Sequence, residues 1–396
     1  MRLTAIHNIF IVCILAFAFL FTSCVGEEES LSGSENSAKS FLVLRVGTVG
    51  GLRDITSALP DIEKMHSLRI VILNDGGRVE KNLYVPFDNA VQEYVYRSVE
   101  VTPGHKKVFL FANEESATGV LDDAGKKQDL SFFLNNYQVN ATGFENEVKS
   151  LRFAPDYSAE KPIQMSSVYE VDVPSQGVVE KDFFVVRNAT KFSVRFTNRR
   201  DKALTVKSLT LSSMADWAFV MPHKQNLEME FVEADGSKNM YFWIDWLEKV
   251  SQESQAFPND RNLADRRGWI MDYDIPAEAV HSEYVNNMPG GIVLDALVYD
   301  NGIPKPGKAD CQPFYLPESK NLKSENLYGE QEYFIKVKVT DHRNNEDKEL
   351  SCPLDNLRAL FRSTHVVIDV SFSNDNGILV DVIPYSEVIL EPEFGL

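Results

Sequence analysis

The sequence predicts an all-β protein built as two tandem β-sandwich domains with few short helices. A chain of 396 residues is long enough for two domains of ordinary size. Its 25 phenylalanines and 14 tyrosines favour strands over helices. Apolar residues also recur with period two in many short runs separated by turn residues, a pattern typical of β-sandwiches.

The chain begins with a signal for export. A weakly cationic start precedes an unbroken apolar run, Ile9–Phe21, and two small residues then lead to Cys24. This pattern predicts a secretory signal over residues 1–23, because the run is too short for a transmembrane helix and no basic flank follows it. A cysteine at this point resembles a bacterial lipobox, which implies cleavage before Cys24 and acylation of its thiol. The alternative is an ordinary signal peptide that leaves an unmodified cysteine at its end.

Residues 24–39 are rich in Glu and Ser and contain almost nothing to bury. Such a composition predicts a disordered tether that holds the folded part away from the membrane.

The N-terminal domain is expected over residues 40–189. The sequence Asn74–Gly77 supplies residues that tolerate positive φ, so it predicts a hairpin after its preceding strand. Residues 129–136 fit a short helix. The expected strands are Phe41–Val46, Leu68–Leu73, Val108–Ala112 and Phe183–Val186.

The C-terminal domain is expected over residues 190–396, because a new alternating series begins at Lys191. Apolar residues at helical spacing predict short helices over Tyr241–Ser251 and Pro353–Arg362, and the Pro- and Gly-rich stretch Gln252–Ala309 predicts a loop-rich insertion. The expected strands are Lys191–Thr197, Leu204–Leu211, Tyr333–Thr340, Val366–Phe372 and Ile378–Ile383.

Charge and motifs exclude several functions. The formal net charge is −18 with no basic block, which argues against nucleic acid and anionic membrane surfaces as partners. The chain contains no glycine-rich phosphate loop, nucleophile elbow or HExxH motif, so we expect no enzymatic activity and no cofactor.

The cysteines leave two alternatives open. Cys13 lies in the export signal and Cys24 is the lipidation candidate, so Cys311 and Cys352 remain in the folded part. An exported protein can join them in a disulfide, and two separately buried thiols are the alternative. No cysteine pair has the spacing of a zinc site, so no metal is expected.

Several short motifs, individually weak, occur in an order that resembles the fimbrillin family of pilus subunits from Gram-negative anaerobes. The resemblance spans nearly the whole chain after Cys24. The motifs are Ser67–Leu73, Val101–Asn113, Pro162–Ser166 (Pro-x-x-Met-Ser), Lys191–Ser212, Phe314–Ser319 (Tyr-x-Pro-Glu) and Leu360–Val366 (Arg-Asn-x-His, with Ser363 in place of Asn).

The resemblance implies two transthyretin-like domains and assembly from a lipoprotein precursor in the outer membrane. In this family a trypsin-like, arginine-specific protease removes the first strand, and a C-terminal strand of the next subunit fills the vacated groove. The residues that match the removable strand are Phe41, Leu42, Val43, Leu44 and Val46. The residues that match the donor strand are Val388, Ile389, Leu390 and Phe394.

Arg53 matches the processing position because it follows a Gly-rich loop behind the first strand. Arg45 is the second candidate, although it lies inside that strand, and Arg53 could equally be an ordinary surface residue. The segment that contains Val388 could likewise be the final strand of its own domain.

These features predict a structural subunit of a cell-surface fimbria whose partners are other subunits. The alternative is a tip adhesin, or a lipoprotein that binds a host glycan or protein through the Trp-bearing stretch Tyr241–Ile275.

Overall fold

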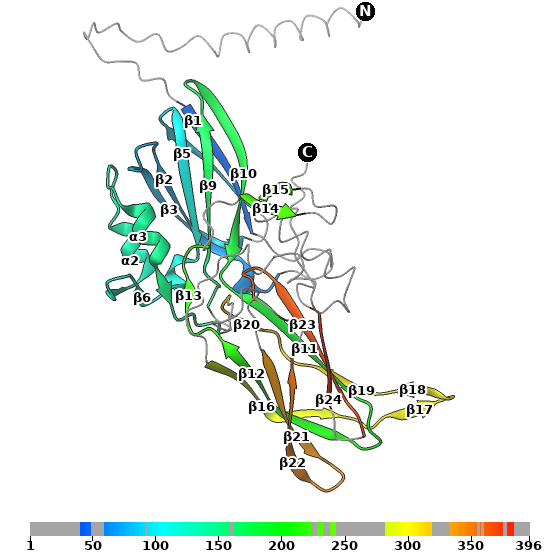
Figure 1. The fold of residues 1–396 in the computed structure, drawn as a ribbon. Helices are drawn as coiled ribbons and strands as arrows, with labels where there is room; N and C mark the ends of the chain where they lie inside the picture. The colour runs from blue at the N-terminus through cyan, green and yellow to red at the C-terminus, as the bar shows by residue number, and fades with distance from the viewer. Residues whose placement is uncertain are drawn as a thin grey trace, which may run out of the picture. The chain divides into compact units, whose positions relative to one another are not determined.

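The computed structural model describes residues 40–48, 59–91, 94–158, 161–222, 228–232, 238–242, 282–318, 333–354, 357, 360–374 and 378–383. All of these described residues belong to one compact unit, Lys39–Leu396. In the described residues strands dominate and α-helices are few and short, which confirms the predicted all-β class (Figure 1).

The first half of the compact unit contains a seven-stranded sheet. Its strands are β1 (Ser40–Thr48), β2 (Met65–Leu73), β3 (Val79–Val91), β4 (Tyr94–Val101), β5 (Gly104–Ala112), β9 (Met165–Val173) and β10 (Gly177–Arg187). They follow the order β3-β2-β5-β9-β10-β1-β4. Because β9 and β10 pair only near Val186 and Arg187, the sheet divides there into two layers. Side chains from both layers form one buried apolar cluster, so the layers pack face to face.

Two short helices cover the opposite face of the β3-β2-β5-β9 layer (Figure 1). They are α2 (Leu130–Asn135) and α3 (Phe144–Ser150). Phe144 packs edge-on against Phe109 of β5 with ring centroids 5.2 Å apart. The helix predicted over residues 129–136 is confirmed, whereas α3 was not predicted. A small sheet beside the helices contains β6 (Val120–Leu121), β7 (Lys127–Gln128), β8 (Arg152–Phe153) and β13 (Ala218–Phe219).

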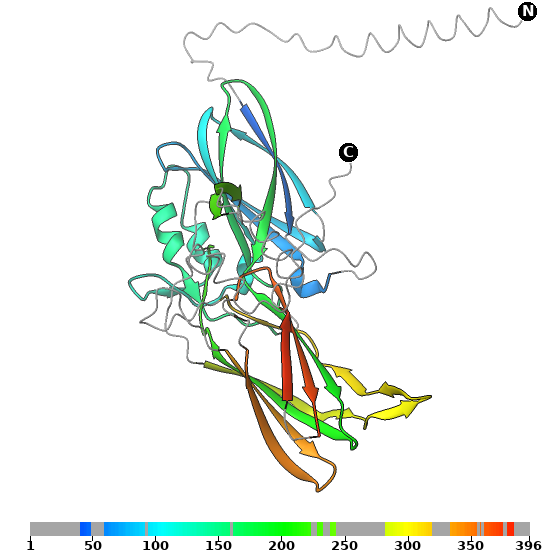
Figure 2. The same ribbon diagram turned by 45° about the vertical axis from the view of Figure 1, so that its right-hand side comes forward.

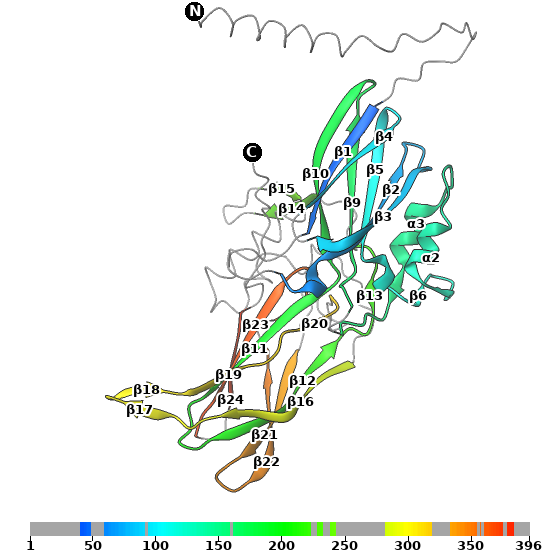
Figure 3. The ribbon, with the colours of Figure 1, turned by 180° about the vertical axis from the view of Figure 1, so that it is seen from behind.

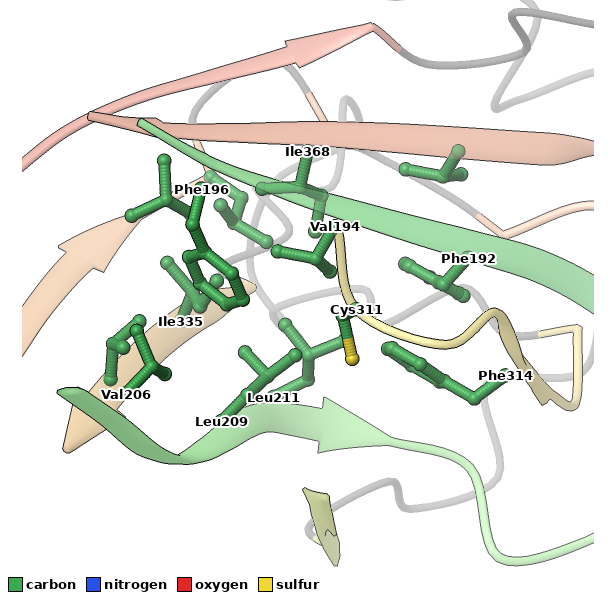
Figure 4. Packing of buried hydrophobic residues seen from close by; sticks show 14 of the residues in the cluster. Phe192, Val194, Phe196, Val206, Leu209, Leu211, Cys311, Phe314, Ile335 and Ile368 are labelled. Carbon is green, nitrogen blue, oxygen red and sulfur yellow. The ribbon is translucent and has the colours of Figure 1, made fainter. Parts of the chain in front are cut away.

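The second half is a sandwich of a five-stranded and a four-stranded sheet. The first sheet contains β11 (Thr190–Asn198), β19 (Gly307–Asp310), β20 (Phe314–Leu316), β23 (His365–Phe372) and β24 (Ile378–Ile383). The second contains β12 (Leu204–Met214), β16 (Ser282–Leu294), β21 (Phe334–Asp341) and β22 (Glu346–Pro353). Alternate residues of both sheets, such as Val194 and Leu209, point into a common core (Figure 4).

Two hairpins stand outside these sheets. One joins β14 (Glu228–Val232) to β15 (Lys238–Phe242). The other joins β17 (Val298–Asp300) to β18 (Ile303–Lys305) and extends beyond the neighbouring strands (Figure 2, yellow).

The chain changes from one set of sheets to the other between β10 and β11, across Asn188 and Ala189. This is where the sequence places the domain boundary. Residues Lys39–Leu396 nevertheless form one compact unit, so the division at 189/190 stays a prediction.

The expectation of loops over Gln252–Ala309 is wrong from Ser282 onward, where β16, β17, β18 and most of β19 lie. The Gly and Pro residues that suggested loops lie in β16, an edge strand, at a position where such a strand tolerates them. Beside Gly290 and Gly291, whose φ angles are positive, the pairing of β16 with β12 shifts register. A bulge on an edge strand absorbs such residues without ending the strand.

The helix predicted over Tyr241–Ser251 is wrong where the structure describes it, since Tyr241 belongs to β15. The remainder of that segment lies outside the described residues. The helix predicted over Pro353–Arg362 is also not formed by its described residues, because Pro353 ends β22 and the Leu357 N–H donates to the Leu354 carbonyl in a turn. None of the described helices is long and apolar enough to cross a membrane.

Candidate functional site

The candidate site is β1 together with the slot that it fills. We define the slot as the space between β10 and β4, lined by residues 177–185 and 94–101 (Figure 3). All nine residues of β1 pair in parallel with β10, and residues 40–47 also pair antiparallel with β4. Both main-chain edges of β1 are therefore satisfied, as in a central strand.

The inward face of β1 points into the buried cluster between the two layers. Leu42, Leu44 and Val46 are each 0% exposed there. Burial of such a side chain contributes roughly 1.5–3 kcal/mol, so this face alone is a substantial stabilising contact. Alternate apolar residues in an extended segment produce this face because successive side chains point to opposite sides of a strand.

The outward face of β1 carries a charge pair with β10. Nε of Arg45 lies 2.5 Å from Oδ1 of Asp182 and 3.6 Å from Oε1 of Glu180. Phe41 is 38% exposed on this face, whereas Val43 is buried. At the start of the strand the Ser40 hydroxyl donates to the Pro174 carbonyl at 2.7 Å. Arg45 thus adds an ion pair between β1 and β10 on the solvent side.

Removal of β1 would open two sheet edges at once. Among the described strands, β4 hydrogen-bonds in the sheet only to β1. Without β1, β10 would keep only its short pairing with β9 near Val186 and Arg187. Two unpaired edges above an exposed apolar cluster form a strong template for another strand.

The structure separates the predicted site residues into two groups. It places Phe41, Leu42, Val43, Leu44, Arg45 and Val46 together on β1. Cys24, Arg53 and the donor residues Val388, Ile389, Leu390 and Phe394 lie outside the described residues. Arg45 occupies the middle of a strand paired on both sides, and a protease that needs an extended, accessible backbone cannot bind there while β1 is in place.

The two remaining cysteines differ in burial, because Cys311 is buried and Cys352 is half-buried. Cys311 is a free thiol, so the disulfide with Cys352 is not formed. Its sulfur lies in the core of the second half, where it accepts a hydrogen bond from Asn286 at 3.3 Å (Figure 4). Burial raises the pKa of the Cys311 thiol, which keeps it protonated and unreactive.

A buried polar group that the sequence did not predict lies where the two halves meet. We call Glu63, Arg187, Lys191 and Tyr315 the junction cluster. Glu63 ends the 3-10 helix η2 (Asp61–Glu63) and is 1% exposed. Its carboxylate pairs with Arg187, lies 2.9 Å from Nζ of Lys191 and accepts a hydrogen bond from the Tyr315 hydroxyl at 2.6 Å.

The junction cluster ties the segment after β1 to both halves. Burial raises the pKa of Tyr315, so its hydroxyl stays a donor to Glu63. No sequence signal could have identified this cluster, because Glu63 and Arg187 are 124 residues apart.

Two of the sequence motifs also meet at this boundary. Arg362 and Glu318 form an ion pair with side chains 0% and 1% exposed, and Nε of Arg362 donates to Glu318 at 2.8 Å. Ser363, which stands where the family motif has Asn, adopts a left-handed φ of 57°. Among residues other than Gly, Asn is one of the few that adopt this conformation readily. Here the Ser363 hydroxyl instead accepts a hydrogen bond from the Arg187 N–H at 2.7 Å.

The described part of the chain offers no group of three or more His, Cys, Asp and Glu side chains that could hold a metal ion. The site consists of a strand, its two neighbours and the buried apolar cluster on which they pack.

Comparison with known proteins finds similarity at the level of solved structures. No family model matches the sequence, and no curated protein matches it. The tip fimbrial protein Mfa3 from Porphyromonas gingivalis, solved with a C-terminal truncation, aligns with TM-score 0.48 and 11% identity over 88% of this chain and 100% of that one. A fimbrial assembly protein from Parabacteroides distasonis aligns with TM-score 0.42 and 10% identity over 89% of this chain and 98% of that one. Because the TM-scores and identities are this low, the functional proposal below rests on the residues of the chain itself.

Proposed function

We propose that this chain is a fimbrillin-type structural subunit of a cell-surface fimbria and that it assembles by strand exchange. The observation that carries the proposal is the position of β1. It is the first described strand, yet it lies inside a sheet with β10 on one side and β4 on the other. A single cut behind it would detach a strand that is central to the sheet, without breaking the rest of the fold.

The proposed route begins with a lipoprotein precursor anchored in the outer membrane through Cys24. A trypsin-like, arginine-specific protease then cleaves after β1 at Arg53. The β1 segment leaves, and the C-terminal donor strand of a neighbouring subunit enters the slot, while the Val388–Phe394 region of this chain serves as the donor for another subunit. The mature protein thereby becomes part of a fimbrium on the cell surface, in a structural role without catalysis.

The energetics support a durable joint. Each main-chain hydrogen bond of a docked strand contributes ~0.5–1.5 kcal/mol net, and each large apolar side chain in the position of Leu42, Leu44 or Val46 contributes ~1.5–3 kcal/mol. Together these terms are on the order of 10 kcal/mol before the cost of ordering the donor, which is enough for slow dissociation. While β1 fills the slot, it also protects the edges from aggregation during export.

The test is Arg53→Ala in cells that produce the intact precursor. We expect the variant to keep the residues before Arg53 and to form no fimbriae, measured by N-terminal sequencing of the surface protein and electron microscopy. Arg78→Ala is the matched control, because Arg78 is an exposed residue of the β2–β3 turn. Normal fimbriae from the Arg53→Ala variant would refute the proposed processing.

A second candidate function is adhesion at a fimbrial tip. The β17–β18 hairpin favours it because Val298, Tyr299 and Ile303 are 57%, 70% and 64% exposed. Large apolar side chains held this far out of a fold are typical of binding surfaces. Binding to an array of host glycans and proteins that is lost on Tyr299→Ala, with assembly intact, would support this role.

A further inference from the structure

The slot has an acidic outer rim whose negative charge Arg45 offsets in part. Asp182 and Glu180 both lie on the outward side of β10, and both contact the Arg45 guanidinium. Their side chains are 33% and 50% exposed, so departure of β1 would leave two carboxylates without this cation. On the other side of the slot, Glu100 of β4 is exposed opposite Phe41 and adds a third negative charge.

The inner side of the slot has the opposite charge. Lys181 of β10 and Arg97 of β4 both lie opposite Leu44 and thus on its face of the sheet. A donor strand therefore meets negative charge on its outward face and positive charge on its inward face.

The C-terminal segment of this chain has the wrong charge pattern for that slot. Its apolar alternation places Val388, Leu390 and Phe394 on one face. The opposite face then carries Glu387, Glu391 and Glu393.

With the apolar face turned inward, the glutamates face the acidic rim. In that orientation the outward positions would be 387, 389, 391 and 393, and all of them except 389 are Glu. The outward positions of β1 that face Glu180 and Asp182 are those of Val43 and Arg45. Two consecutive outward positions of the segment always include a glutamate, so every such register sets like charges side by side. Like charges directly opposite in a sheet are destabilising, and the inward cations gain no carboxylate in return.

We propose that the slot selects a donor strand with Lys or Arg on its outward face at the position of Arg45, and that its natural occupant comes from a different subunit rather than from a second copy of this chain. This inference rests on the proposed strand exchange and names the partner of the same site.

The experiment uses the full chain with a site-specific protease sequence inserted within residues 49–58. After cleavage, the protein is incubated with an excess of fluorescent peptides, and their uptake is followed by anisotropy. The four peptides are residues 40–48, the same peptide with Arg45→Glu, residues 384–396, and the latter with Glu387→Lys and Glu391→Lys. A second protein with Glu180→Gln and Asp182→Asn has the same slot without the acidic rim.

We expect the 40–48 peptide to bind on the order of tenfold more tightly than its Arg45→Glu variant. The lysine-bearing 384–396 peptide should exceed the native one by a similar factor. Both ratios should fall towards one in the protein with the neutral rim. Each ratio compares two peptides on the same protein, so a small change in the stability of that protein affects both peptides equally and cancels.

The outcomes separate the two levels of the hypothesis. If the 40–48 peptide does not enter the slot of either protein, strand exchange itself fails and the inference falls with it. If that peptide enters but native 384–396 binds as tightly as its lysine variant, exchange stands and the charge selection is wrong. A second copy of this chain would then be as suitable a donor as a chain with lysines at these positions.

Discussion

The two halves of the molecule place their first strand in the same way but hold it differently. β1 runs parallel to β10, the last strand of the first half, and β11 runs parallel to β23 near the end of the second. Each also pairs antiparallel on its other side, β1 with β4 and β11 with β19 and β20. One cut in residues 49–58 would separate β1 from the strands it pairs with, whereas β11 follows directly on β10 and would need two cuts. Equal hydrogen bonding can therefore support a replaceable strand in one half and a permanent strand in the other.

The polar contacts at the start of the two strands also differ. At the start of β11 the Thr190 hydroxyl donates to the Phe361 carbonyl at 2.8 Å, and the Lys191 N–H donates to the Thr364 carbonyl at 2.9 Å. Lys191 also joins the junction cluster. β1 is held at its start by the buried Ser40 and along its outer face by the partly exposed Arg45. β11 thus has two polar side chains that contact buried groups at its start, Thr190 and Lys191, where β1 has one, Ser40.

A covalent lock on β1 should have the largest effect. Val43 and Ser98 are directly opposite in the β1–β4 pairing, at a distance that a disulfide can span. We expect Val43→Cys with Ser98→Cys to reduce assembly to background under oxidising conditions and to recover on reduction. Polymer content by electron microscopy and non-reducing gels is the measurement.

The equivalent lock in the second half is the control for that comparison. Thr197 and Lys308 are opposite in the β11–β19 pairing, so Thr197→Cys with Lys308→Cys fixes a strand that we expect never to exchange. Loss of assembly in this variant would show that the two first strands are equivalent after all.

Neutralisation of Glu63 should have the next largest effect. Glu63→Gln leaves Arg187 and Lys191 without their carboxylate, and breaking a buried ion pair costs about 3–5 kcal/mol. We expect the native chain to unfold in one calorimetric transition and the variant in two, one for each half. Asp61→Asn on the same 3-10 helix is the control, since its exposed pair with Lys64 should contribute under ~1 kcal/mol. One unchanged transition would mean that the junction cluster does not couple the halves.

Truncation of a side chain on the inward face of β1 should weaken the packing of β1 in the sheet without affecting distant strands. Leu44→Ala removes a fully buried side chain, which costs about 2–5 kcal/mol. We expect faster amide hydrogen exchange in β1 and β4 but unchanged exchange in β11. The partly exposed Phe41 serves as control, because Phe41→Ala should cost distinctly less. Equal acceleration in β11 would contradict independent behaviour of the two strands.

The smallest effect is expected from acid acting on Asp341 in the second half. Burial acts to raise the pKa of Asp341, but the Arg343 N–H and the Arg200 guanidinium outweigh it and hold that pKa below its usual range. A carboxyl group whose pKa is lowered by folding adds stability above its unfolded pKa of about 4, and this contribution disappears as pH falls through the folded value. The stability difference between the native chain and Asp341→Asn should therefore shrink on acidification below about pH 4. Urea unfolding at several pH values measures this, and a difference that grows in acid would contradict it.

The strand positions were largely predictable from local pattern. The alternation in Phe41–Val46 and Lys191–Thr197 matches β1 and β11, and the turn at Asn74–Gly77 does join β2 to β3. Errors arose where local signals have two meanings. Glycines and a proline around Gly290 indicated loops but lie in a bulged edge strand. Apolar residues near Tyr241 had helical spacing, yet Tyr241 pairs in a hairpin.

By itself, the sequence determined that the segment at Leu42 and Leu44 is a strand with one apolar face, because that property depends only on neighbours two residues apart. It also contains the glutamates at positions 387, 391 and 393, on alternate residues of the C-terminal segment. Only the tertiary structure decided that β1 lies between β10 and β4, that Arg45 faces Asp182, and that Glu63 is buried against Arg187. These partners lie tens to more than a hundred residues away along the chain, and period-two patterning is the same for every possible neighbour, so it cannot specify which strand a strand will pair with.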